Sequence, residues 1–112
     1  MIMETLAEKF QSELTKGRQL FENKDYNRAF HHFERAHILG QPSYIRHVRS
    51  HYWMLRVGLK IIDFREVVGQ IIRILGSAGS LFGKYPVGNT GGANVSPFKP
   101  MPIPDDLKPY LE

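Results

Sequence analysis

Apolar residues recur at intervals of three and four along the first 40 residues, which is the spacing of an α-helix that buries one face. A first run spans about residues 3–22, and its repeating positions are Leu6, Phe10, Leu14, Gly17 and Phe21. A second run begins at Asp25, a good N-cap residue, and stops before Gly40, which suits the position after a helix. The chain is therefore predicted to begin with a pair of helices, over about residues 3–22 and 25–39.

Two further helices are predicted between residues 42 and 82. The third extends from Pro42, whose missing N–H fits a first helical turn, to about Ile62. The fourth is expected to be capped by Asp63, with Glu66 in capping-box register. The expected core stripe of the third helix consists of Val48, Tyr52, Leu55, Leu59 and Ile62.

The fourth predicted helix carries an apolar stripe that is too wide for one packing partner. Its members are Val67, Val68, Ile71, Ile72, Ile74, Leu75, Ala78, Leu81 and Phe82. Ordinary packing in a bundle and self-association both explain such a stripe, whereas a membrane-surface role fits less well because the polar face is short. We expect a homodimer formed through this helix or through the C-terminal segment.

Proline divides the chain into two parts. Residues 1–84 contain only Pro42, and the other six prolines lie in residues 85–112. We therefore expect a helical domain over residues 1–84 and an extended tail over residues 85–112. Apolar residues such as Phe98 are interleaved with these prolines, so the tail can lie in a groove of its own helices or of a partner subunit. The glycine-rich residues 87–94 lack the lysine of a phosphate loop and indicate a demanding turn.

Composition excludes several classes of protein. With 112 residues the chain fits one domain, and with no cysteine it has no disulfide, no thiolate zinc site, no iron–sulfur cluster and no thiol nucleophile. A formal charge of +4, scattered along the chain, does not favour nucleic acid as a partner. Neither a secretory signal nor an apolar run of roughly 20 residues is present, which predicts a cytoplasmic protein without a membrane span.

All five histidines lie between residues 31 and 51, and some of them are spaced as metal ligands. His47 and His51 stand at i and i+4 on one predicted helix, and Glu34 and His37 stand at i and i+3 on the helix before it. A short turn makes these helices antiparallel neighbours, so the four side chains can converge. One hypothesis is a single divalent metal such as zinc, held by Glu34, His37, His47 and His51. The alternatives are a hydrogen-bonded polar network with no cofactor and a general acid–base pair.

A basic stripe on the third helix is a candidate binding surface for another protein. Trp and Arg are the residue types enriched at binding hot spots. We therefore predict a partner site formed by Arg49, Trp53, Arg56 and Lys60 of the third helix together with Phe98 of the tail.

Two resemblances extend this interpretation. Gly17, Tyr26, Ala29, Phe33 and Ala36 resemble the consensus of one tetratricopeptide repeat, a helical hairpin in which small residues allow close packing. Over residues 17–107 the chain also resembles a small bacterial family, domain of unknown function 3703, through segments 34–41, 47–55 and 86–104. This second resemblance implies no activity or ligand, but it implies that the histidine-bearing helices and the tail form one unit.

The sequence thus predicts an all-α protein, a small four-helix bundle with a tetratricopeptide-like hairpin and an extended tail. No nucleophile elbow and no pair of carboxylates around a cleft is evident, so we expect a non-catalytic protein–protein interaction module. The alternative is a metal-binding protein that uses the Glu/His cluster, and a small hydrolase built on His and Glu comes third.

Overall fold

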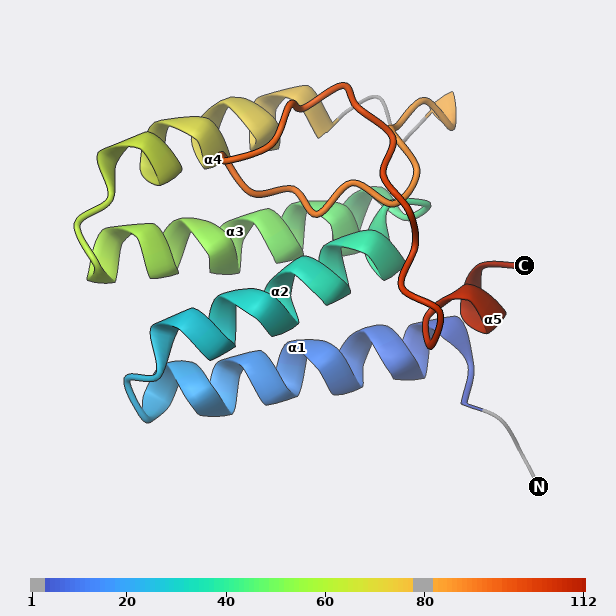
Figure 1. The fold of residues 1–112 in the computed structure, drawn as a ribbon, viewed down its shortest axis with the longest axis horizontal. Helices are drawn as coiled ribbons and strands as arrows, with labels where there is room; N and C mark the ends of the chain where they lie inside the picture. Colours follow the sequence, from blue (N-terminus) through green and yellow to red (C-terminus); the bar gives the residue numbers. More distant parts are fainter. Residues whose placement is uncertain (1–3, 78–81) are drawn as a thin grey trace.

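Four long helices pack in a row, each mainly against the helix before it (Figure 1). The computed structural model describes residues 4–77 and 82–112, and within these ranges all regular secondary structure is helical. The all-α prediction is therefore confirmed. The helices are α1 (Leu6–Glu22), α2 (Tyr26–Gly40), α3 (Tyr44–Lys60), α4 (Phe64–Gly76) and the short α5 (Lys108–Leu111).

Side-chain caps fix where three of these helices begin. Thr5 and Glu8 form a capping box at α1. The predicted cap of α4 is confirmed, because the Asp63 carboxylate accepts a hydrogen bond from the Glu66 backbone N–H. The expected capping box at this helix is wrong, however, because the Glu66 side chain bonds elsewhere. Pro42 also lies outside α3, since Ser43 is its N-cap.

The hairpin of α1 and α2 is held by the close approach that the small residues allow. A methyl group at Gly17 would lie 2.4 Å from an atom of the Phe33 ring, so only glycine fits there without displacing that ring. Ala29, Phe33 and Ala36 are fully buried in the same interface. The expected close packing at these positions is confirmed.

The core stripe predicted for α3 is wrong, because the helix is rotated about its axis and buries a different face. Tyr52, Leu59 and Ile62 are exposed, and the buried side of α3 combines polar and small residues with Met54 and Val57. Its buried residues are His47, Ser50, His51, Met54, Val57 and Gly58. Burial of this face is tolerated in part because its polar groups find hydrogen-bond partners: His51 bonds to Gln70 of α4, and Ser50 donates to the His47 carbonyl.

The tail returns across α4, α3 and α2 and ends beside the start of α1 (Figure 1). Polar groups hold it along the way: Gln41 donates to the Pro86 carbonyl, and Arg73 donates to the Val95 carbonyl. Leu107 anchors its end, fully buried in the core, and Arg35 pairs with Asp106 nearby. The tail thus covers the open side of its own helices.

The outer face of α4 remains apolar and exposed. Phe64 is 74% exposed, Val68 56% and Leu75 78%, and Ile71 and Ile72 lie on the same stripe. The α4 stripe, as we call Phe64, Val68, Ile71, Ile72 and Leu75, is spaced as one helix face. Of the residues predicted for this stripe, Ala78 and Leu81 lie outside the described residues. Within the described ranges, no helix combines the length and the apolar character that crossing a membrane requires.

Candidate metal centre

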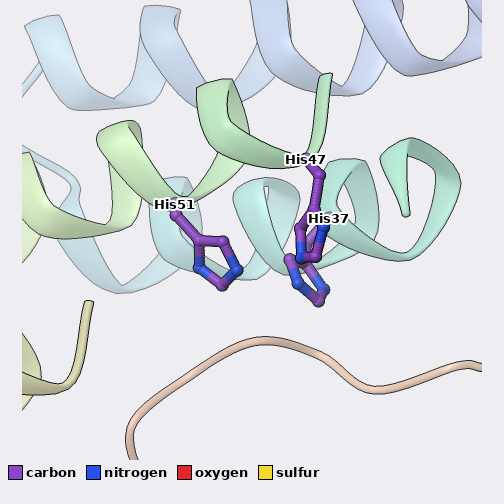
Figure 2. A group of neighbouring side chains, drawn as sticks. All are labelled: His37, His47 and His51. Atoms are coloured by element: carbon purple, nitrogen blue, oxygen red, sulfur yellow. The ribbon is translucent and has the colours of Figure 1, made fainter. Parts of the chain in front are cut away.

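Three histidines from two helices converge at one buried point. His37 comes from α2, and His47 and His51 come from successive turns of α3. One ring nitrogen from each lies within 4.8 Å of the others, and the side chains point together toward the tail (Figure 2). The three residues are no more than 7% exposed. Tetrahedral zinc with Zn–N bonds of about 2.0–2.1 Å needs nitrogens about 3.3 Å apart, so small ring movements would close a site.

Hydrogen bonds fix the tautomer of two of these rings. His37 Nδ1 lies 2.7 Å from the Asn89 carbonyl oxygen, which can only accept, so Nδ1 carries the proton. His51 Nδ1 lies 2.6 Å from Gln70 Oε1 and donates in the same way. In a neutral imidazole the other nitrogen, Nε2, then keeps its lone pair. This is the arrangement by which proteins present imidazole to a metal.

The partner of His51 is itself held in one orientation. Gln70 Nε2 donates to a carboxylate oxygen of Glu66 at 2.6 Å and to the Gly91 carbonyl at 2.8 Å. Because both of these atoms accept, the amide must turn Oε1 toward His51. The same oxygen of Glu66 also accepts from the Ala93 backbone N–H. A chain of bonds therefore runs from the tail through α4 to His51.

The partner of His37 is fixed within the tail. The Asn89 side chain donates to the carbonyls of Ser96 and Lys99 and accepts from the Gly91 N–H. These bonds close the glycine-rich turn, and the positive φ of Gly88 and Gly91 lets the backbone make it. The turn places Gly91 against the His37 ring, where a methyl group would approach to 2.7 Å. The glycine-rich residues 87–94 therefore form the predicted turn, and this turn is one wall of the site.

A cavity of about 200 Å³ opens beside the three rings. The imidazoles form part of its wall, and α4 and the tail supply the rest. Its wall includes two cations and several apolar side chains, notably Arg73, Lys84, Tyr85, Ile72, Pro97 and Phe98. No carboxylate lines it among the described residues. A ligand can therefore approach the rings without moving a helix.

Burial keeps the three imidazoles neutral at physiological pH. It lowers the pKa of His47 to about 4, and burial together with the charge of His47 lowers that of His51 to about 3. Burial, with repulsion from the other two rings, lowers the pKa of His37 well below its usual value. Neutral imidazole is the form that binds a metal, because the lone pair is free.

Glu34, the fourth ligand predicted from sequence, lies outside this group of ligand atoms. It stands one helical turn before His37 on α2, and the charged side chain that acts on it is Glu66 of α4. Burial, reinforced by repulsion from Glu66, raises the pKa of Glu34 to about 7. The structure thus brings together three of the four predicted ligands.

Replacing Glu34 with glutamine is expected to stabilise the protein at alkaline pH. A folded pKa near 7, against 4.5 for a free glutamate, means that stability is lost as the pH rises from 4.5 through 7. Glutamine removes this loss, so urea unfolding at pH 8 should show a gain of about 1–2 kcal/mol after allowance for solvent screening. The gain should nearly vanish at pH 5. An equal gain at both pH values would contradict the raised pKa.

The predicted partner site does not form one exposed patch. Trp53 is half-buried, stacks on Phe33 at 5.6 Å, and lies under the guanidinium groups of Arg18 and Arg56. Its place on α3 follows from the rotation of that helix, which turns Trp53 toward α1 and α2. Arg49, Lys60 and Phe98 are exposed, Phe98 to 85%, but Phe98 lies at the cavity on the tail.

Sequence reasoning missed the residues that orient the imidazoles. Gln70, Asn89 and Gly91 are separated from their histidine partners by 19 residues or more. For Asn89 and Gly91 the only signal was the pattern of glycine and asparagine in the tail, which predicted a special turn but not where that turn packs.

Comparisons with known proteins yield a family and nothing more specific. A family model described as "Protein of unknown function (DUF3703)" matches residues 4–111. No curated protein and no solved structure matches the chain. The match spans the helices and the tail together.

Proposed function

The chain belongs to the DUF3703 family, whose function is unknown, and we propose that it is a metal-binding protein that holds one divalent transition metal at His37, His47 and His51. The observation that carries the proposal is the convergence of three buried, neutral imidazoles within 4.8 Å. Zinc is the first choice, because imidazole suits it and three histidines are a known zinc ligand set.

The burial of His37, His47 and His51, which we call the triad, supports a metal site over a role in packing alone. Three imidazoles in contact bury polar nitrogens that an apolar core would avoid. Two of them are oriented from behind by carbonyl oxygens, and the acceptor of one is itself locked by Glu66 and Gly91. Such outer partners fix the tautomer and the direction of metal ligands in proteins.

The test is zinc binding by the untagged, chelator-treated protein, followed by native mass spectrometry and thermal unfolding. One zinc per chain is expected, and zinc at 100 times its Kd should add about 2.7 kcal/mol to the free energy of unfolding. His47→Ala should weaken binding at least 100-fold, whereas His31→Ala, an exposed histidine on α2, should bind as the wild type does. Equal zinc binding by both variants, or none by the wild type, would contradict the proposal.

The α4 stripe supports a second role, a homodimer that packs α4 against its copy. Its spacing resembles a coiled-coil seam, which two copies can interdigitate about a twofold axis. With Ile61 and Ile62, in the turn before α4, this surface exposes on the order of 800 Å², about what one side of a stable interface buries. A second copy is the favoured occupant because the stripe is self-complementary and uncharged.

Dimerisation is tested by sedimentation of the metal-free and zinc-loaded protein. Leu75→Asp should give a monomer, because it places a charge on the stripe at a position that is exposed in the single chain. Ile45→Asp, equally exposed but at the start of α3, should remain a dimer. A wild-type protein that stays monomeric at high concentration would exclude this second role without touching the first.

A further inference from the structure

The triad leaves a bound metal one ligand short. Three imidazoles fill three positions of a tetrahedral ion, and neither the cluster nor the cavity wall contributes a carboxylate among the described residues. Structural zinc sites use four protein ligands, whereas sites that keep a position open use three. The open position would face the cavity of about 200 Å³, because the helices and the Gly91 turn close the other sides.

The charge around that position calls for an anion. Neutral imidazoles leave the two positive charges of the ion uncompensated, and Arg73 and Lys84 add two more on the cavity wall. Neither cation forms an ion pair with the residues that the structure describes. Uncompensated charge is costly in a partly buried site. Glu66 lies near Arg73, but it is already engaged by Gln70 and Ala93.

Arg73 is held in place with one donor unused. Its two terminal nitrogens donate to the carbonyls of Gly69 at 3.1 Å and Val95 at 2.9 Å. Its Nε is buried and has no hydrogen-bond partner among the described residues. Arg73 lines the cavity and its charge acts on His37 and His51, so it places a fixed positive charge beside the triad, which suits a carboxylate.

The remaining walls are apolar and set the size of the ligand. The lining side chains with apolar surface include Ile72, Tyr85, Pro97 and Phe98. A cavity of about 200 Å³ has room for several water molecules or for a small organic molecule. Apolar walls favour a ligand with a short hydrocarbon chain over a fully hydrated inorganic anion.

We infer that a short-chain monocarboxylate binds in this cavity, with its carboxylate on the open position of the metal and beside Arg73, and its chain against Ile72 and Phe98. The inference rests on the proposed function, because it needs the metal. It assigns the protein a small-molecule ligand rather than storage of the metal alone.

The test uses cobalt(II) as the metal, because its visible spectrum reports the ligands around it. Acetate, butyrate and inorganic phosphate are titrated separately into the cobalt-loaded full chain. Butyrate should change the spectrum saturably and at lower concentration than acetate, and phosphate should be weakest. Arg73→Gln should weaken butyrate binding about 10- to 100-fold with one cobalt still bound per chain.

Each of the other outcomes would refute either the metal site or the assigned ligand. Cobalt binding with no response to either carboxylate would refute the ligand and leave the metal site intact. Failure to bind cobalt or zinc would refute the metal site, and the ligand with it. Should Arg73→Gln fail to fold, Lys84→Gln, at an exposed position, should still weaken butyrate binding severalfold. Unchanged binding in both variants, or tighter binding of phosphate than of butyrate, would refute the assigned carboxylate.

Discussion

Acidification below about pH 6.5 is expected to destabilise the metal-free protein steeply, over a pH range in which ordinary carboxylates are still mostly ionised. The three imidazoles of the triad are neutral in the folded chain, with pKa values of about 4 for His47, about 3 for His51, and a value well below 6.5 for His37. In the unfolded chain each would titrate near 6.5. Stability is therefore complete above pH 6.5 and is lost as the pH falls toward the folded pKa values.

The size of this effect follows from the number of protons. Each proton that unfolding takes up contributes a slope of about 1.4 kcal/mol per pH unit, so three contribute about 4 kcal/mol per unit near pH 5. At this slope a stability of about 5 kcal/mol, the lower end of the ordinary range, is lost over about one to two pH units. Glu34 opposes the effect by up to one proton, because it is protonated in the folded chain up to about pH 7.

The measurement is urea unfolding between pH 7.5 and 4.5 in the presence of a chelator, in the Glu34→Gln background so that the triad is observed alone. His51→Gln should reduce the slope by about one third, because it removes one of three protons. A change in the free energy of unfolding of less than about 1.4 kcal/mol per pH unit, the slope for one proton, would show that the fold does not keep the rings neutral. It would also weaken the proposed metal site, which needs neutral imidazoles.

The convergence of the histidines could be predicted because it depends on local rules. His47 and His51 share a helix face at i and i+4, and the short turn between α2 and α3 brings His37 opposite them. Both facts are legible in the spacing of the chain. The N-cap at Asp63 and the close packing at Gly17 were predictable for the same reason, since each depends on neighbouring residues or on one hairpin.

The rotation of α3 could not be predicted from the chain's hydrophobicity. Val48, Tyr52 and Leu59 look more apolar than the face that is buried, which carries His47, Ser50 and His51. On that face His51 depends on an acceptor from α4, Gln70, which lies 19 positions further along the chain. The acceptor for the neighbouring His37 of α2 is Asn89 of the tail, 52 positions away, and no local pattern specifies where the tail lies.

The same dependence explains why Glu34 lies outside the histidine cluster. Its spacing from His37 allows a shared site, but the site lies where the tail crosses α2, one turn beyond Glu34. The tail provides Asn89 to His37, so a carboxylate is not needed as its partner. The sequence therefore predicted which histidines the helices bring together, but it did not predict the hydrogen-bond partners that orient their rings.

Gly91→Ala is expected to disturb the metal site through the His37 ring. The added carbon would lie 2.7 Å from the His37 ring, and Gly91 has a φ of +85°, which L-residues adopt at a cost. Overpacking adds about 1–3 kcal/mol to a strain of about 1–2 kcal/mol, so we expect a loss of roughly 2–5 kcal/mol in the free energy of unfolding. Zinc affinity should fall about 10- to 100-fold, because the ring that carries a ligand nitrogen must move.

Gly83→Ala separates the two causes. Gly83 also has a positive φ, +69°, but a methyl group there meets no described atom within 4 Å. This variant should lose only the backbone strain of about 1–2 kcal/mol and should bind zinc as the wild type does. If the two variants lost equal stability and neither lost zinc affinity, the tail would not press on His37, and the tail could not be a wall of the metal centre. A selective loss of zinc affinity in Gly91→Ala would instead tie the geometry of the triad to the glycine-rich turn, which only the folded tail brings to it.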